Sequence, residues 1–89
     1  MKAVITVTGS DKIGIIAGVT SLLAESSVNI LDINQTIMDG IFTMIMMADT
    51  SESQTPFEEL QEKLDNKGKE MGVSVRIQRE DVFRAMSEL

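Results

Sequence analysis

The segment Thr8–Val19, TGSDKIGIIAGV, has the residue types of an anion-binding turn. A β-branched stretch ends there, a glycine-containing turn follows, and a predicted helix opens with Gly14 in its first turn. Glycine lowers helix stability relative to alanine, so its presence indicates that something approaches the backbone closely. Free N–H groups and the positive end of the helix form a natural seat for a carboxylate. Alternatively, Gly14 and Gly18 only let this helix pack closely on a neighbour, and the two interpretations are compatible.

Two further groups of side chains have atoms that can bind a metal or transfer a proton. Met44, Met46 and Met47 carry thioether sulfur, but strand alternation turns Met47 to the opposite face, and no His or Cys completes a metal site. We interpret these methionines as core filling. Asp32 and Asp39 are carboxylates that a metal or acid–base chemistry could use, but they lie far apart along a strand heading for a turn. We interpret both carboxylates as solvated residues at a strand edge and a turn.

Composition excludes much other chemistry. The 89 residues contain no Cys and no His, which removes thiol nucleophiles, disulfides, imidazole bases and zinc sites built from those ligands. A net charge of −6 repels nucleic acid and anionic membranes on average. The longest nearly apolar run, Ile41–Ala48, is too short to span a membrane, and no signal peptide is evident. We expect one cytoplasmic domain, residues 1–89, without metal or cofactor and without nucleic-acid or membrane partners.

The elements that must position the glycine turn follow from periodicity. Alternating β-branched residues predict a strand over Lys2–Thr8, and helical spacing predicts a helix over Ile13–Ser26 that Ser10 or Asp11 could cap. Val28–Met38 predicts a second strand, with Leu31, Ile33 and Ile37 on one face. Asp39-Gly40 then predicts a two-residue hairpin, because both residues tolerate positive φ. Ile41–Asp49 is apolar on both faces apart from Thr43, which predicts a central strand.

The second half of the chain repeats this order. Thr55 as N-cap, Pro56 as first helical residue and Glu58 in a capping box predict a helix start, and Met71 indicates that the helix reaches Gly72 despite Gly68. Alternation predicts a fourth strand over residues 73–78, and helical spacing predicts a tail helix over residues 80–89. The order β-α-β-β-α-β, with right-handed crossovers, predicts an α+β ferredoxin-like sandwich with both long helices on one face of a four-stranded antiparallel sheet.

Several functions known for this fold require residues that this sequence lacks. An RNA-recognition domain needs aromatic residues on its central strands, and only Phe42 is available there. A metal chaperone needs paired cysteines in the first loop, which are absent. An acylphosphatase-like enzyme needs an arginine in that loop, which has only Lys12. We find neither a nucleophile–base pair nor a clustered carboxylate pair, so we predict that the protein is not an enzyme.

The order and spacing of four motifs resemble the ACT domain, a small βαββαβ module that senses amino acids in metabolic regulation. The sequence is most similar to a microbial family of stand-alone ACT proteins. The resemblance covers the whole chain, which is one ACT domain followed by the tail helix. The motifs are DKIGIIAGV at Asp11–Val19, NILDI at Asn29–Ile33, MDG at Met38–Gly40 and IQREDVF at Ile77–Phe83. The family often has His at the positions of Arg79 and Ser87, and this sequence departs from it at both.

The resemblance implies a ligand pocket between the first loop and helix start of one subunit and the second strand of its partner. Asn29 is the most informative position, because an amide can donate to a carboxylate and accept from an ammonium group. The implied ligand residues are Gly9, Asp11, Lys12, Ile13, Gly14, Ile15, Asn29, Ile30 and Leu31.

Two functions therefore remain open. One is a non-enzymatic regulatory module that binds a small ligand, an amino acid, at a homodimer interface. The other is an interaction subunit that modulates a protein partner, an enzyme or transcription factor, without a ligand of its own. We expect a homodimer because Val4, Thr6 and the Met and Phe positions of the third strand leave the second sheet face partly apolar. We also expect Val82, Phe83, Met86 and Leu89 of the tail helix to pack on that face, in the same subunit or its partner.

Overall fold

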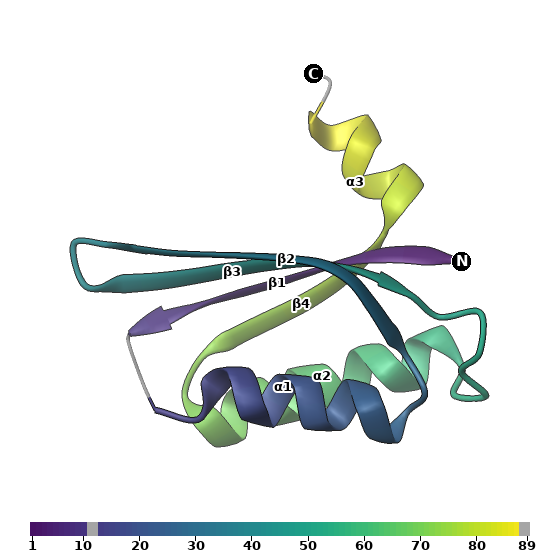
Figure 1. Ribbon diagram of the computed structural model, residues 1–89, viewed down its shortest axis with the longest axis horizontal. Coiled ribbons are helices and arrows are strands. Elements are labelled where there is room, and N and C mark those ends of the chain that lie inside the picture. The colour runs from purple at the N-terminus through teal and green to yellow at the C-terminus, as the bar shows by residue number, and fades with distance from the viewer. Residues whose placement is uncertain (11–12, 88–89) are drawn as a thin grey trace.

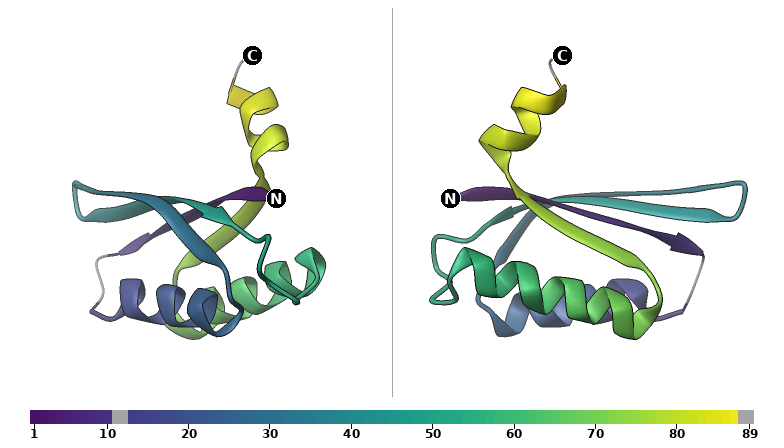
Figure 2. Two further views of the ribbon diagram at one scale, coloured as in Figure 1. Left: turned by 45° about the vertical axis from the view of Figure 1, so that its right-hand side comes forward. Right: turned by 180° about the vertical axis from the view of Figure 1, so that it is seen from behind.

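The computed structural model describes residues 1–10 and 13–87 of the chain. The elements are β1 (Lys2–Ser10), α1 (Ile15–Glu25), β2 (Asn29–Met38), β3 (Ile41–Asp49), α2 (Phe57–Met71), β4 (Ser74–Arg79) and α3 (Glu80–Ser87). All neighbouring strands are antiparallel, in the order β2-β3-β1-β4. Both long helices cover one face of the sheet, and α3 stands on the opposite side (Figures 1 and 2). The predicted ferredoxin-like α+β fold is confirmed. Asp11 and Lys12 of the predicted ligand loop, and Leu89 of the tail helix, lie outside the described residues.

The core lies between the sheet and the two long helices. Central strands β1 and β3 fill it from the sheet, as the apolar third strand predicted. The sheet residues buried there are Ala3, Ile5 and Val7 of β1, Phe42, Met44, Met46 and Ala48 of β3, and Val75 and Ile77 of β4. Leu23 of α1 and Leu60 and Leu64 of α2 close it from the helices. We expected Phe42 and the methionines of the third strand to make the sheet face opposite the helices apolar. This is wrong for Phe42, Met44 and Met46, because strand alternation points these side chains toward the helices.

The β2–β3 hairpin follows the sequence prediction. Asp39 and Gly40 both have positive φ, 51° and 80°, as a two-residue turn of this kind requires. The turn extends the hairpin beyond the end of β1, as Figure 1 shows at the left of the molecule. Because β2 pairs only with β3, its other edge is free of backbone partners among the described residues.

The start of α2 differs from the prediction by one residue. Pro56 has the extended backbone of an N-cap residue (φ −57°, ψ 149°), and no described side chain caps the helix. Thr55 instead donates its N–H to the Ser53 hydroxyl in the preceding turn, so the predicted capping box does not form. The helix does reach Gly72, which adopts a left-handed conformation and ends it.

Strand β2 contains a bulge at Leu31. Register with β3 shifts between Ile30 and Asp32, so Leu31 has no partner in the ladder. From Ile33 onward the strand is exposed along its whole length, although Ile33 and Ile37 pair with the core residues Met46 and Phe42. Exposure here comes from edge position, because neither α1 nor another strand covers the outer side of β2.

Candidate functional site

The N-terminus of α1 is free of a side-chain cap. Gly14 is the N-cap residue with φ +90°, and no side chain among the described residues bonds to the first helical turn. The first backbone bond that reaches into the helix runs from the Gly18 N–H to the Gly14 carbonyl, 2.8 Å. The N–H groups of Ile15, Ile16 and Ala17 precede it and have no partner within the helix. This end of α1 can therefore donate hydrogen bonds to an anion.

A hollow of about 540 Å³ lies beside this helix end. It is bounded by the start of α1, the distal half of β2 and one residue of β3. The lining residues are Ile13, Gly14, Ile15, Ile16, Ala17, Gln35, Ile37 and Phe42. Its walls are apolar except for the Gln35 amide and the helix N–H groups. Such a site suits a small ligand that has both a carboxylate and an apolar or neutral remainder.

The structure brings only part of the predicted site together. Ile13 and Gly14 are exposed and border the hollow, whereas Ile15 borders it mainly as a buried core residue. Gly9 lies near the end of β1, where a Cβ would come within 2.6 Å of a Val73 methyl group. Gly9 therefore serves packing against the α2–β4 turn.

Asn29, Ile30 and Leu31 lie at the opposite end of the sheet. Asn29 pairs with Asp49 at the end of β3, while Gly9 pairs with Phe42 near the start of β3. The eight steps from Ile41 to Asp49 correspond to about 26 Å of strand. Within one chain, Asn29 therefore cannot contact a ligand held at the α1 N-terminus.

The sequence prediction missed five residues of the hollow. They come from the first turn of α1, the outer half of β2 and the start of β3: Ile16, Ala17, Gln35, Ile37 and Phe42. The available signal was the two-residue period of β2, which places Gln35 on the same face as Ile33 and Ile37.

The two glycines of α1 serve different purposes. A Cβ at Gly14 would meet nothing within 4 Å, so the positive φ alone requires glycine there. A Cβ at Gly18 would lie 2.6 Å from the Met71 sulfur of α2, so Gly18 permits close packing of the two helices. Close packing thus explains Gly18 but not Gly14, and the space beside Gly14 is open.

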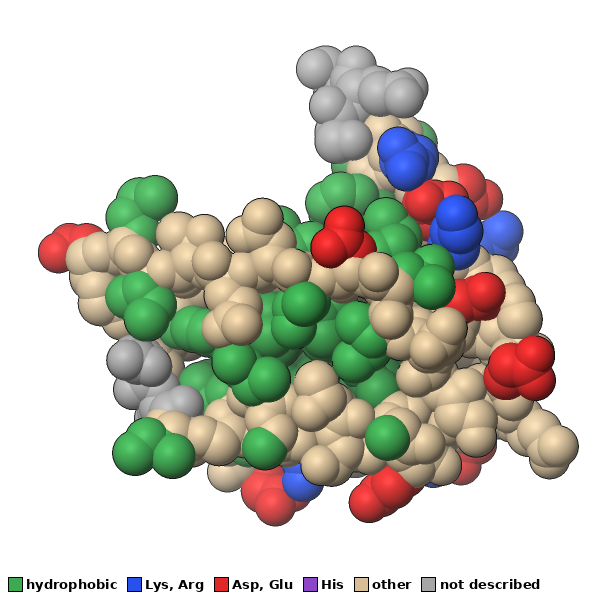
Figure 3. Space-filling view, viewed as in Figure 1, with side chains coloured by type: hydrophobic (Ala, Val, Ile, Leu, Met, Phe, Trp, Pro, Cys, Tyr) green, Lys and Arg blue, Asp and Glu red, His purple; other side chains and the backbone are tan. Residues whose placement is uncertain are grey.

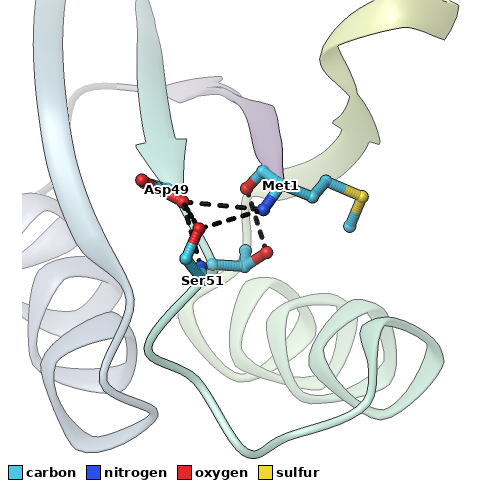
Figure 4. Close-up of polar contacts among 4 residues, drawn as sticks. Met1, Asp49 and Ser51 are labelled. Atoms are coloured by element: carbon cyan, nitrogen blue, oxygen red, sulfur yellow. Dashed lines mark hydrogen bonds and ion pairs between the residues drawn. The ribbon is translucent and has the colours of Figure 1, made fainter.

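The end of the sheet that carries Asn29 also holds a polar cluster (Figure 4). The Asp49 carboxylate accepts hydrogen bonds from the Ser51 hydroxyl and from the Ser51 N–H, and it lies 3.6 Å from the Met1 ammonium group. These hydrogen bonds, with the ammonium charge, lower the pKa of Asp49 below its usual value of 3.8. Thr50 donates to the Met1 carbonyl oxygen, which ties the start of β1 to the end of β3.

Other site chemistry is not evident in the part of the chain that the structure describes. No cluster of three or more His, Cys, Asp or Glu residues that could hold a metal ion occurs within residues 1–10 and 13–87. Over the same residues, no helix has the length and apolar character needed to cross a membrane.

Comparison with known proteins identifies the family. Residues 2–78 match the ACT domain family model. A UPF0237 protein of Clostridium acetobutylicum is 56% identical over 89 residues, the full length of both chains. A UPF0237 protein of Methanocaldococcus jannaschii is 46% identical over 88 residues, covering 99% of this chain and 98% of the relative. The chain belongs to the UPF0237 family of ACT domain proteins. It is thus an ACT domain, a small regulatory module.

Solved structures agree with this assignment. An ACT domain protein from Streptococcus pneumoniae superimposes on the UPF0237 protein with a TM-score of 0.83 and 41% identity, covering 93% of each chain. The ligand-free regulatory subunit of aspartate kinase from Thermus thermophilus superimposes with a TM-score of 0.68 over 89% of this chain and 51% of that one. At 24% identity, the second likeness concerns the fold alone.

Proposed function

We propose that this UPF0237 protein is a non-enzymatic regulatory module that binds an amino acid at the interface of a homodimer. The observation that carries the proposal is the division of the predicted site between two ends of one sheet. The helix end and the hollow lie at one end, and Asn29 lies at the other. A second copy of the chain can supply the missing half.

The free edge of β2 offers the way to join the two halves. If β2 pairs antiparallel with β2 of a second copy, the start of one strand lies beside the end of the other. Asn29 of the second copy then comes next to Met38, close to Gln35 and Ile37 in the wall of the hollow. A two-fold axis repeats the arrangement, giving two equivalent ligand sites per dimer.

An apolar strip along the same edge supports this mode of pairing. Figure 3 shows hydrophobic side chains gathered between the sheet and α1, on the side where β2 and α1 face the viewer in Figure 1. The exposed large apolar residues of these elements and the preceding turn are Ile13, Ile16, Leu31, Ile33, Ile37 and Met38. A ten-residue strand with one free edge beside such a strip is a surface that proteins ordinarily cover.

The chemistry of the hollow favours a zwitterion as ligand. The α1 N–H groups can receive a carboxylate, and the apolar walls can receive an aliphatic side chain. The amide oxygen of Gln35 can accept from the ammonium group, and the resemblance to the ACT family assigns a second polar contact to Asn29 of the second copy. A net charge of −6 disfavours polyanions such as nucleotides, whereas a zwitterionic amino acid carries no net charge. A lining without a nucleophile, a base or a carboxylate pair supports binding without turnover.

A thermal-shift screen of the twenty common amino acids tests the proposal. A ligand at one hundred times its Kd stabilises the folded state by about 2.7 kcal/mol per site. For a domain of this size, that stabilisation raises Tm by at least about 10 °C. We expect one or a few amino acids to produce such a shift and Asn29→Ala to abolish it.

Asn34→Ala is the matched control, because it removes the same amide from the same face of β2 at a position that does not line the hollow. We expect it to keep the shift. If no amino acid changes Tm, the interaction-subunit alternative replaces ligand sensing. If Asn29→Ala retains the full shift with the ligand, the composite site is wrong even though binding occurs.

A further inference from the structure

A second apolar surface lies away from the β2–α1 edge. The sheet face opposite the helices, here called the open face, carries alternate residues of all four strands. Ile41, Ile45 and Met38 lie on it and are 56%, 43% and 71% exposed. Ile41 and Met38 lie at the hairpin end of the sheet, and Ile45 lies midway along β3.

Helix α3 stands on this open face but covers only its other end. Figures 1 and 2 show α3 rising from the sheet on the side away from α1 and α2. Phe83 is half-buried and lines a hollow of about 200 Å³ together with Val4, Ile45 and Met47. Val82 and Met86 lie on the same side of α3 as Phe83 and remain 46% and 48% exposed. The expected packing of the tail helix on its own sheet is therefore realised mainly by Phe83.

Element lengths explain why one α3 cannot cover the face. An upright helix covers a patch about as wide as its own diameter, about 10–12 Å with side chains, whereas the nine residues of β1 extend about 30 Å. Glu80 begins the helix directly after Arg79 ends β4, so no linker lets α3 move toward the hairpin. The apolar residues at the hairpin end are thus out of its reach.

We propose that a second copy of this chain covers the open face, with α3 of each copy lying against the hairpin half of the other sheet. A two-fold axis parallel to the sheets places the two upright α3 helices at opposite ends, where together they cover about 20–24 Å of the face. The height of an upright α3 also matches the spacing of about 10 Å at which two facing sheets pack. The exposed stripe of Val82 and Met86 then meets the hairpin end of the other copy, where Ile41 and Met38 are exposed.

Charge favours a second copy at this face. The strand side chains on it include two cations, Lys2 and Arg76, and two anions, Asp32 and Asp49. The face is therefore balanced, while the whole chain carries −6. Two anionic proteins that meet through this face avoid the repulsion that their net charge imposes elsewhere. The surface is separate from the β2 edge, so the inference does not depend on the proposed ligand.

Sedimentation velocity at tens of micromolar tests the interface with charge substitutions on each side of it. Met86→Glu and Ile41→Glu should each halve the mass of the wild-type assembly. Ala85→Glu places the same charge on another side of α3, and we expect the wild-type mass to persist. Circular dichroism verifies that each variant folds, as the exposure of these side chains leads us to expect.

The outcomes separate this interface from the β2 edge. Ile33→Glu places a charge at the β2 edge and not on the open face, so it should disrupt only the pairing of the proposed ligand site. A wild-type monomer, or a Met86→Glu protein with unchanged mass, overturns the open-face proposal. If Met86→Glu leaves the mass unchanged, the open face is a surface for a different protein. A wild-type dimer that Met86→Glu dissociates and Ile33→Glu does not would support the open face and refute the β2 pairing.

Discussion

Two glycines within helices differ in what surrounds them, so alanine should destabilise the fold at one position and be tolerated at the other. A Cβ at Gly68 of α2 would lie 2.8 Å from the Val73 carbonyl oxygen and 3.2 Å from the Val75 backbone nitrogen. Both atoms belong to backbone held by hydrogen bonds, since the Val73 N–H donates to the Gly68 carbonyl and Val75 lies in the β4 ladder. A Cβ at Gly18 of α1 would instead meet the sulfur of Met71, near the end of a flexible side chain.

The expected sizes follow from two opposing effects. Replacing glycine by alanine inside a helix stabilises it by about 1 kcal/mol. Overpacking against atoms that cannot move costs about 1–3 kcal/mol. Gly68→Ala should therefore lower the free energy of unfolding by about 1 kcal/mol, because the overpacking exceeds the helix gain. Gly18→Ala should range from neutral to about 1 kcal/mol more stable, because the Met71 thioether can turn aside.

Thermal unfolding followed by circular dichroism measures both variants. The chain has no Trp or Tyr, so helix ellipticity is the practical signal. A change of 1 kcal/mol corresponds to about 4–8 °C in Tm for a domain of this size. Protein concentrations must be equal, because self-association makes Tm depend on concentration. The reasoning is refuted if Gly68→Ala melts at or above the wild type, or if Gly18→Ala loses as much stability as Gly68→Ala.

Three further outcomes follow from the structure. Gly14→Ala should destabilise the chain by about 1–2 kcal/mol in denaturant unfolding, because a Cβ has room there but φ is +90°; unchanged stability would contradict this. Asp49→Asn should lower Tm near neutral pH, because the Asp49 carboxylate, whose pKa is lowered in the fold, stabilises the fold only while it is ionised. The Tm difference between variant and wild type should therefore vanish as the pH falls below 3.8. A Tm difference that stays constant with pH would assign the effect to packing. The chain has no native cysteine, so Asn29→Cys and Met38→Cys proteins can be mixed to test the pairing of β2 between copies. If the two β2 strands pair antiparallel, the mixture should form a mixed disulfide. Absence of the mixed disulfide in mass spectra would count against that pairing.

Features that depend on a few neighbouring residues were predictable from the sequence. The Asp39-Gly40 turn was predicted because its positive φ angles restrict which residues can occupy it. The central place of β3 was predicted because a strand apolar on both faces needs cover on both sides. The family motifs led to the ACT fold, which the comparisons establish independently.

The start of α2 shows where local rules compete. Thr55, Pro56 and Glu58 satisfy the pattern of a capping box, yet Pro56 takes the N-cap position. The Ser53 hydroxyl accepts from the Thr55 N–H, which draws Thr55 into the preceding turn. Two motifs of similar strength shared the same residues, and the pattern alone did not rank them.

The candidate site depended on distance through the fold. Gly14 and Asn29 are recognisable in the sequence, but only the register of β1, β2 and β3 reveals that they lie at opposite ends of one sheet. The hollow likewise contains Gln35 and Phe42 because folding carries the distal half of the hairpin to the start of α1. Side-chain type and periodicity determined which residues can bind, turn or pack. Tertiary structure decided which of them meet, because antiparallel pairing converts separation along the chain into position along a sheet.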